Sequence, residues 1–67
     1  MIDNILSIYS QELKMSDLKE SDDFFEVGGH SMIMANIQRR IKDELKIDVP
    51  MEILFTHLTV KSLSEHI

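Results

Sequence analysis

The chain of 67 residues contains no cysteine, which excludes a disulfide framework and a thiolate metal site. It has no apolar run near membrane-spanning length, and no basic segment followed by an apolar one marks a secretion signal at its start. We therefore expect a cytoplasmic protein with no membrane-bound part. Glycine and proline are also scarce, at two residues and one, and neither a low-complexity segment nor an internal repeat is present.

Basic residues are scarce in the first half of the chain. Residues 1–30 hold seven acidic residues and only two lysines, whereas residues 31–67 hold five residues of each sign, and the overall net charge is −5. An acidic surface repels phosphate backbones, so nucleic acid is not an expected partner. We interpret most of these acids as a solvated face that aids solubility.

Apolar residues recur with helical spacing in the first and middle parts of the chain. A first helix is expected to end at Leu13, with Tyr9 in the core and its hydroxyl at the rim. Its apolar stripe comprises Ile2, Ile5, Leu6, Tyr9 and Leu13. A second helix is expected from about Ser31 to Lys46. The side expected to be buried comprises Ile33, Met34, Ile37, Ile41 and Leu45, and the opposite side comprises Met32, Asn36, Arg39 and Asp43.

Two shorter helices are expected after the second. Pro50 suits the first turn of a short third helix. The apolar residues of that helix are Met51, Ile53, Leu54 and Phe55. Thr59 is expected to be the N-cap of a last helix, in which Val60, Leu63 and Ile67 repeat with helical spacing. The sequence therefore predicts an all-α fold, a small four-helix bundle with a short third helix, in one domain of residues 1–67.

A long connection, residues 14–30, separates the first two helices. It is longer than most links between packed helices, and loops of this length with apolar anchors are usually ordered or functional. The expected anchors are Met15, Leu18, Phe24, Phe25 and Val27. We interpret Phe24 and Phe25 as core anchors rather than as a ligand cage, and we expect them to fix the position of the residues that follow.

The most informative stretch runs from Asp22 to Met32 and includes Gly28-Gly29-His30-Ser31. Adjacent glycines permit backbone angles that other residues avoid, and they let another molecule approach the main chain closely. Ser31 follows them at a predicted helix start. On the residues alone, an N-cap that satisfies free amide groups is the favoured interpretation of Ser31, ahead of a functional serine.

No catalytic constellation accompanies Ser31. A hydrolytic serine needs a base within hydrogen-bond reach and a third group that orients the base. His30 adjoins Ser31, but sequence neighbours that leave a turn seldom aim their side chains at each other, and His57 and His66 would approach only through chance packing. The histidines do not have zinc spacing, and the acids of residues 22–26 do not match a calcium loop. We therefore expect neither catalytic residues nor a metal site.

The segment from Phe24 to Ser31, Phe-Phe-Glu-Val-Gly-Gly-His-Ser, resembles the attachment motif of peptidyl carrier (thiolation) domains of nonribosomal peptide synthetases. The resemblance extends over nearly the whole chain and is strongest over residues 22–33. Phe55 and the Thr59-Val60 pair are also similar to the family's residues. The departures from the family's usual residues are Tyr9, Met32-Ile33-Met34 and Leu58.

Membership of this family implies that Ser31 carries a 4′-phosphopantetheine arm. A phosphopantetheinyl transferase, using Mg²⁺ and coenzyme A, would join the pantetheine phosphate to the Ser31 hydroxyl, at a helix N-terminus that favours anions. The terminal thiol would hold aminoacyl or peptidyl groups as thioesters and carry them between adenylation, condensation or other tailoring enzymes. The carrier itself would be a monomer without catalytic activity.

The resemblance also implies a partner surface around Ser31. Met32 is expected to be an exposed apolar residue beside the serine, suited to adaptable docking. The other candidate partner contacts are His30, Asn36 and Arg39. The Arg39-Arg40 pair is otherwise interpreted as solvated surface.

Other branches of the family and one other class of protein remain open. Acyl carriers of fatty acid synthesis typically have Asp-Ser-Leu at the site and an acidic second helix, whereas residues 31–46 hold four basic and two acidic residues. That balance favours the peptidyl or aryl branch. The alternatives are an aryl or acyl carrier of a polyketide or hybrid pathway, and an unmodified helical interaction module in which Ser31 is only a cap. The start at Met1 suggests a free-standing protein, although an excised domain would look the same.

Overall fold

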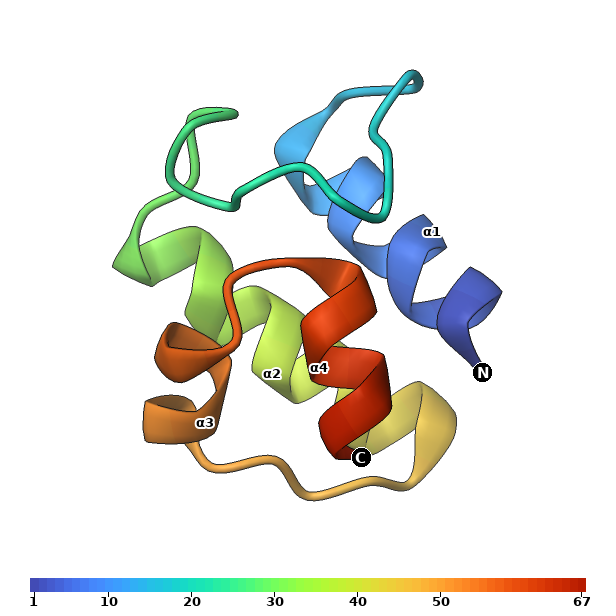
Figure 1. Ribbon diagram of the computed structural model, residues 1–67. Coiled ribbons are helices and arrows are strands. Elements are labelled where there is room, and N and C mark those ends of the chain that lie inside the picture. Colours follow the sequence, from blue (N-terminus) through green and yellow to red (C-terminus); the bar gives the residue numbers. More distant parts are fainter.

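The computed structural model describes residues 1–67 and contains four helices and no strand. The helices are α1 (Ile2–Leu13), α2 (Ser31–Leu45), α3 (Met51–Thr56) and α4 (Val60–His66), shown in Figure 1. This confirms the predicted all-α fold with its short third helix. Helix α2 ends one residue earlier than expected, because Lys46 adopts a left-handed conformation with φ of 60°. None of the helices combines the length and the apolar composition that a membrane crossing requires.

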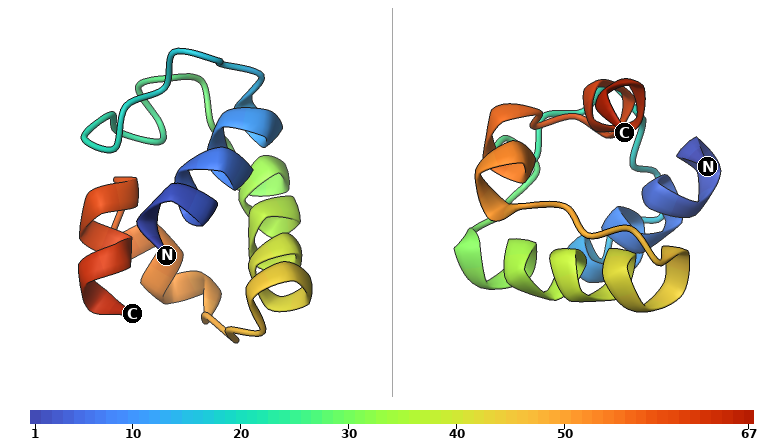
Figure 2. Two further views of the ribbon diagram at one scale, coloured as in Figure 1. Left: turned by 90° about the vertical axis from the view of Figure 1, so that its right-hand side faces the viewer. Right: turned by 90° about the horizontal axis from the view of Figure 1, so that it is seen from below.

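Helix α1 packs between two neighbours. It contacts α2 and α4, while α3 contacts α2. The two views in Figure 2 show α2 along one side of the molecule, with α3 and α4 on the other sides of the core. Residues 14–30 cross the end of the bundle at which α2 and α4 begin (Figure 1). The long connection therefore covers the end of the core nearest to Ser31.

One apolar core holds the helices together, and no polar or charged residue is fully buried. Its twelve residues are Ile5, Ile8, Tyr9, Leu18, Phe24, Met34, Ile37, Ile41, Val49, Leu54, Val60 and Leu63. The predicted buried side of α2 is confirmed at Met34, Ile37 and Ile41, while Ile33 and Leu45 pack at the edge. Burying one such side chain contributes about 1.5–3 kcal/mol, and a domain this small has few of them.

The position of the Tyr9 hydroxyl differs from the expectation. The residue is only 2% exposed, and its hydroxyl points at the Met34 sulfur, at 3.9 Å, instead of reaching the rim. The ring meets the Phe24 ring edge-on, with centroids 6.0 Å apart. Burial raises the pKa of Tyr9, because the charged phenolate would lose its hydration there. The residues of the predicted stripe of α1 all lie in or against the core, but the burial of Ile8 and the depth of the core around Tyr9 were not predicted.

The loop of residues 14–30 is ordered against the bundle, as predicted. Leu18 and Phe24 are buried in the core, and Met15 and Val27 pack against it. Two backbone hydrogen bonds tie the loop to the α3–α4 region: the Phe24 N–H donates to the Leu58 carbonyl at 2.9 Å, and the Lys61 N–H donates to the Glu20 carbonyl at 3.0 Å. The loop is thus attached at both its middle and its later part, which fixes the turn that precedes α2.

Replacing Thr59 with alanine is expected to lower the free energy of unfolding by about 0.5–2 kcal/mol. The Thr59 Oγ1 accepts a hydrogen bond from the Ser62 backbone N–H at 3.0 Å, which confirms the predicted N-cap of α4. Urea denaturation followed by circular dichroism measures the change. Thr59→Ser retains the oxygen and serves as the control, and an equal loss of stability in both variants would contradict the capping role.

Candidate functional site

A tight turn before α2 delivers the chain to Ser31. The Asp23 Oδ1 accepts hydrogen bonds from the backbone N–H groups of Phe25 and Glu26, at 2.9 and 3.2 Å. These bonds close an Asx-type turn, in which a short acid side chain substitutes for backbone acceptors. Gly28 follows with φ of 97°, a left-handed conformation that side chains rarely adopt. The prediction that the adjacent glycines permit unusual backbone angles is therefore confirmed at Gly28.

Helix α2 begins one residue earlier than it would if Ser31 were its N-cap. His30 is the N-cap, in an extended conformation with φ of −152°, and no side chain caps the first turn. Ser31 is the first helical residue and is exposed. The interpretation of Ser31 as an N-cap is therefore wrong, because its hydroxyl extends from inside the first turn instead of folding back over the amide groups. Capping does not explain this serine.

The first turn of α2 leaves amide groups free for an anion. The first hydrogen bond at this end runs from the Met34 N–H to the His30 carbonyl, at 3.0 Å. The N–H groups of Ser31, Met32 and Ile33 precede it and have no acceptor within the helix. A phosphate attached to the Ser31 Oγ would lie at this positive end of the helix dipole. The residues present thus fit a phosphodiester at Ser31.

An exposed face of α2 continues from Ser31. Met32 is 71% exposed, which agrees with its predicted position opposite the core stripe. His30 and Arg39 are also exposed, and Asn36 is half-buried. These four residues were the candidate partner contacts. Met32, Asn36 and Arg39 lie on the side of α2 away from Ile37 and Ile41, and His30 precedes the helix as its N-cap. They are positioned to meet a partner that approaches Ser31, and their contact with one stays a prediction.

Phe25 was expected to lie in the core, but it lies on the surface. It is 50% exposed, and its ring stacks on the Phe55 ring of α3 with a centroid distance of 5.7 Å and an interplanar angle of 13°. Adjacent residues in a turn direct their side chains differently, so Phe24 takes the buried position and Phe25 the outer one. Phe25 therefore adds an exposed aromatic surface in the loop that leads to Ser31. Sequence reasoning missed it because two neighbouring phenylalanines gave no sign of which one is buried.

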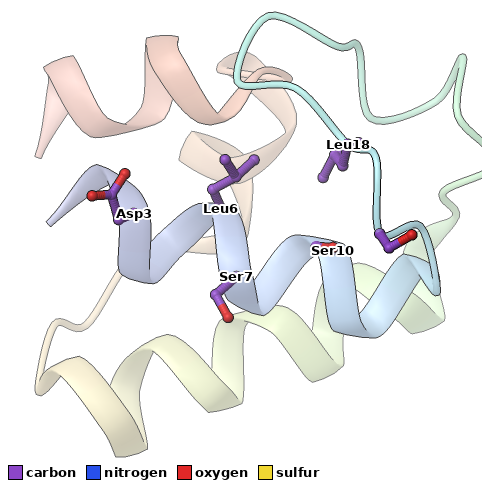
Figure 3. A pocket seen from close by; sticks show the side chains of 6 residues that line it. Asp3, Leu6, Ser7, Ser10 and Leu18 are labelled. Carbon is purple, nitrogen blue, oxygen red and sulfur yellow. The ribbon is translucent and has the colours of Figure 1, made fainter.

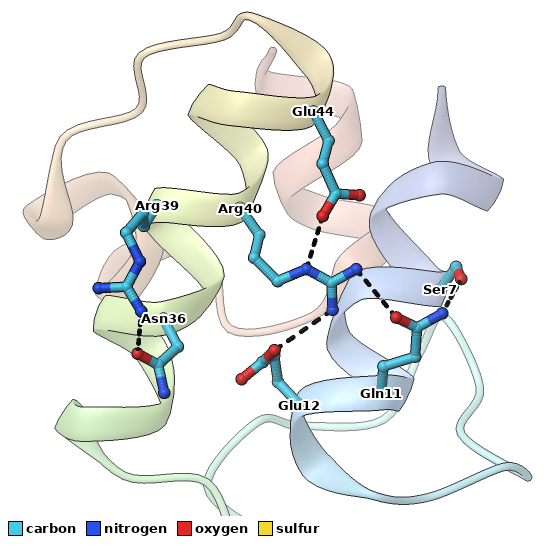
Figure 4. Close-up of polar contacts among 7 residues, drawn as sticks. All are labelled: Ser7, Gln11, Glu12, Asn36, Arg39, Arg40 and Glu44. Atoms are coloured by element: carbon cyan, nitrogen blue, oxygen red, sulfur yellow. Dashed lines mark hydrogen bonds and ion pairs between the residues drawn. The ribbon is translucent and has the colours of Figure 1, made fainter.

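The two arginines of α2 differ in their surroundings (Figure 4). Arg40 is not free surface: its guanidinium donates to Glu12 at 3.2 Å, to Glu44 at 2.7 Å and to Gln11 at 2.9 Å. The Glu44 hydrogen bond is the main reason that the pKa of Arg40 is raised, and the Glu12 carboxylate adds to it. Arg39 bonds only to Asn36 on the same helix, at 2.7 Å. Arg40 ties α2 to α1, and Arg39 remains available at the surface.

The cluster of His57, Ser62 and His66 includes neither Ser31 nor a residue of the turn before α2. The ring centroids of His57 and His66 are 4.6 Å apart, and the His57 Nδ1 is 2.7 Å from the Ser62 Oγ. Both partners of His57 belong to α4. No group of three or more His, Cys, Asp or Glu side chains among residues 1–67 has the arrangement of a metal site. A cavity of about 270 Å³ is lined by Asp3, Leu6, Ser7, Ser10, Ser16 and Leu18 (Figure 3). Its walls come from α1 and the start of the loop, so it is separate from the turn before α2.

The chain matches a known family of protein domains. Residues 3–67 match the family described as phosphopantetheine attachment site. The chain is 40% identical to one of the linear gramicidin synthase proteins of Brevibacillus parabrevis over 63 residues, which cover 94% of the chain and 1% of that protein. It is 37% identical to surfactin synthase subunit 3 of Bacillus subtilis (strain 168) over 67 residues, which cover 100% of the chain and 5% of that protein. The chain thus spans only a small part of these relatives.

A solved structure shares the fold over most of both chains. The structure is that of the phosphopantetheine transferase Sfp in complex with coenzyme A and a peptidyl carrier protein. The TM-score is 0.91 at 25% sequence identity, and the match covers 97% of this chain and 84% of the other. The four helices and their connections are therefore those of a known fold, including the long loop before α2.

Proposed function

This chain belongs to the phosphopantetheine-attachment family, and from that membership we propose that it is a peptidyl carrier domain whose Ser31 bears 4′-phosphopantetheine. The observation that carries the assignment to Ser31 is its exposure as the first residue of α2, directly after Gly28-Gly29-His30. The hydroxyl has no capping role there and is accessible to another enzyme. When bound, the group supplies a thiol on a flexible arm, on which acyl groups are held as thioesters.

In the attachment step, this chain would expose the Ser31 hydroxyl to the transferase and stabilise the negative charge of the phosphodiester that forms. The Ser31 Oγ would form a bond to the phosphorus atom of coenzyme A that carries the pantetheine arm. The bond from that phosphorus to the leaving group, adenosine 3′,5′-bisphosphate, would break, and the hydroxyl proton would pass to a base of the transferase. The free amide groups of the first turn of α2 then face the resulting phosphodiester. The carrier needs no base or metal of its own, because a transferase with Mg²⁺ supplies them.

The proposed partners are a phosphopantetheinyl transferase and the adenylation, condensation or tailoring enzymes that load and use the cargo. The relatives that include synthases of gramicidin and surfactin support an aminoacyl or peptidyl cargo. The positive balance of α2, with Arg39, Arg40 and Lys42 against Asp43 and Glu44, supports the same branch over fatty-acyl carriers. Tethering would raise the effective concentration of the cargo at each partner's active site.

A thiol assay tests the proposal directly, because the chain contains no cysteine. The chain is incubated with coenzyme A, Mg²⁺ and a broad-specificity phosphopantetheinyl transferase, purified, and treated with a thiol reagent. We expect no thiol before the incubation and one thiol per chain after it. A chain that stays free of thiol after complete incubation would exclude the carrier assignment and leave the unmodified interaction module.

Replacing Met32 with glutamate is expected to raise the KM of the chain as a transferase substrate about tenfold, equivalent to about 1.4 kcal/mol, and to leave the fold intact. Met32 is 71% exposed, so the change removes apolar contact surface beside Ser31 without opening the core. Steady-state kinetics with coenzyme A and urea denaturation measure the two effects. Met32→Leu keeps the apolar surface and is the control; a large loss of stability in Met32→Glu would contradict the exposed position.

A further inference from the structure

The two glycines before Ser31 are required for different reasons. At Gly28 the backbone conformation, with φ of 97°, is the constraint, and a Cβ would meet no atom within 4 Å. At Gly29 space is the constraint: a Cβ would lie 2.5–2.6 Å from the Cε1, Cε2 and Cζ atoms of the Phe24 ring. Van der Waals repulsion forbids such distances, so the backbone of Gly29 rests directly against that ring.

Phe24 is the point at which the turn is attached to the rest of the molecule. Its carbonyl accepts the Gly29 N–H at 2.9 Å, and its own N–H donates to the Leu58 carbonyl at 2.9 Å. Its side chain is 1% exposed and meets the ring of Tyr9 edge-on. Tyr9 in turn points its hydroxyl at Met34 of α2. Phe24 therefore connects the turn to α1, to the α3–α4 connection and, through Tyr9, to the underside of α2.

Gly29 precedes Ser31 by two residues, with only the extended N-cap His30 between them. The path of the chain at Gly29 thus determines how it enters α2 and in which direction the Ser31 Oγ extends. A rigid, buried ring beneath Gly29 restricts that path more than the loop backbone would by itself. The candidate docking residues Met32 and Arg39 lie on α2, which packs on the core through Met34, Ile37 and Ile41, so we expect them to keep their positions when this contact is disturbed.

We propose that Phe24 is a positioning residue for modification of Ser31, and that the contact of its ring with Gly29 sets the direction in which the serine hydroxyl is presented. This inference rests on the proposed attachment of phosphopantetheine at Ser31. A displaced hydroxyl would dock with its partner normally and react slowly. Disturbing the contact therefore lowers kcat of the transferase reaction with the chain as substrate and leaves KM for the chain nearly unchanged.

The test compares Gly29→Ala, Phe24→Leu and the double variant with the wild-type chain, using coenzyme A and a phosphopantetheinyl transferase. In Gly29→Ala the new methyl group meets the ring, and we expect kcat to fall at least tenfold with KM within twofold of the wild-type value. Leucine lacks the ring atoms that the methyl group would meet. We therefore expect the double variant to recover at least half of the kcat of Phe24→Leu alone, a rescue that general loss of stability would not produce.

Circular dichroism and urea denaturation are used to check that each variant is folded at the assay temperature. If Gly29→Ala does not fold, the kcat of the double variant is compared with that of Phe24→Leu. A small difference between the two supports the contact, and a loss of tenfold or more in the double variant overturns it. An unchanged kcat in folded Gly29→Ala, or a change in KM alone, also overturns the inference. A wild-type chain that is not modified at all would instead refute the proposed function.

Discussion

Replacing Ser31 with alanine is expected to abolish attachment of phosphopantetheine completely and to leave the free energy of unfolding within about 0.5 kcal/mol of the wild-type value. The hydroxyl oxygen is the atom that would form the bond to phosphorus, and alanine offers no substitute. Stability is expected to stay unchanged because Ser31 is exposed and lies inside the first turn, while His30 occupies the N-cap. Intact mass after incubation with coenzyme A and transferase, together with urea denaturation, measures both effects.

The same substitution separates the carrier from the alternative function. An unmodified helical module in which Ser31 is a cap predicts a loss of about 0.5–2 kcal/mol of stability and unchanged partner binding. Ser21→Ala is a suitable control, because Ser21 is an exposed serine in the loop that precedes α2. It should be modified as fast as the wild-type chain. Modification that persists in Ser31→Ala would assign the arm to another residue.

Replacing Ile37 with alanine is expected to lower the free energy of unfolding by about 2–5 kcal/mol. Ile37 is 0% exposed on the buried side of α2, where the truncated side chain would leave a cavity. Small domains have stabilities near the low end of about 5–15 kcal/mol, so the loss is a large share of the total. Since 1 kcal/mol shifts the midpoint of thermal unfolding by about 4–8 °C in domains of this size, a decrease of about 8 °C or more is expected.

Thermal denaturation followed by circular dichroism measures the effect of Ile37→Ala. Ile37→Val removes one methyl group at the same position and should cost only about 0.5–1.5 kcal/mol. Folded molecules of either variant should still be modified at Ser31, since Ile37 faces the core and not the partner. A loss below about 1 kcal/mol for Ile37→Ala would show that α2 does not pack as described.

Local periodicity was sufficient to predict the helices and their faces. Ile37 and Met32 were assigned to opposite sides of α2 from spacing alone, and their exposures of 0% and 71% agree. The Thr59 cap was likewise predictable, because capping depends on residues within one turn of each other. These features depend on a few neighbouring residues, so a single sequence contains the necessary information.

Features that depend on pairing between distant residues were not predictable. The partner of Phe25 is Phe55, the partners of Arg40 include Glu12, and the Tyr9 hydroxyl meets Met34; each pair joins residues far apart in the chain. The need for glycine at position 29 was also not predictable, although Phe24 is close in sequence, because the path of the turn determines that the ring lies beneath Gly29. The predicted start of the second helix at Ser31 is confirmed, but the N-cap is His30, and this difference of one residue changes the role of Ser31.

The role of Ser31 was predicted from the order of residues 24–31 and not from physical reasoning about the serine. A hydroxyl at a helix start has an ordinary explanation in capping, and the residues alone favoured that explanation. The structure removes it by assigning the cap to His30. The match of residues 3–67 to the phosphopantetheine-attachment family supports the proposed attachment at this exposed hydroxyl.

The central claim is that one serine among seven in this chain is the site of attachment. It is tested most directly by cleaving the modified wild-type chain with a glutamate-specific protease and analysing the fragments by mass spectrometry. Cleavage after Glu26 and Glu44 yields a fragment in which Ser31 is the only serine. We predict that this fragment, and no other, gains the mass of one phosphopantetheine. An unchanged fragment, or the added mass on a fragment that contains a different serine, would contradict the account.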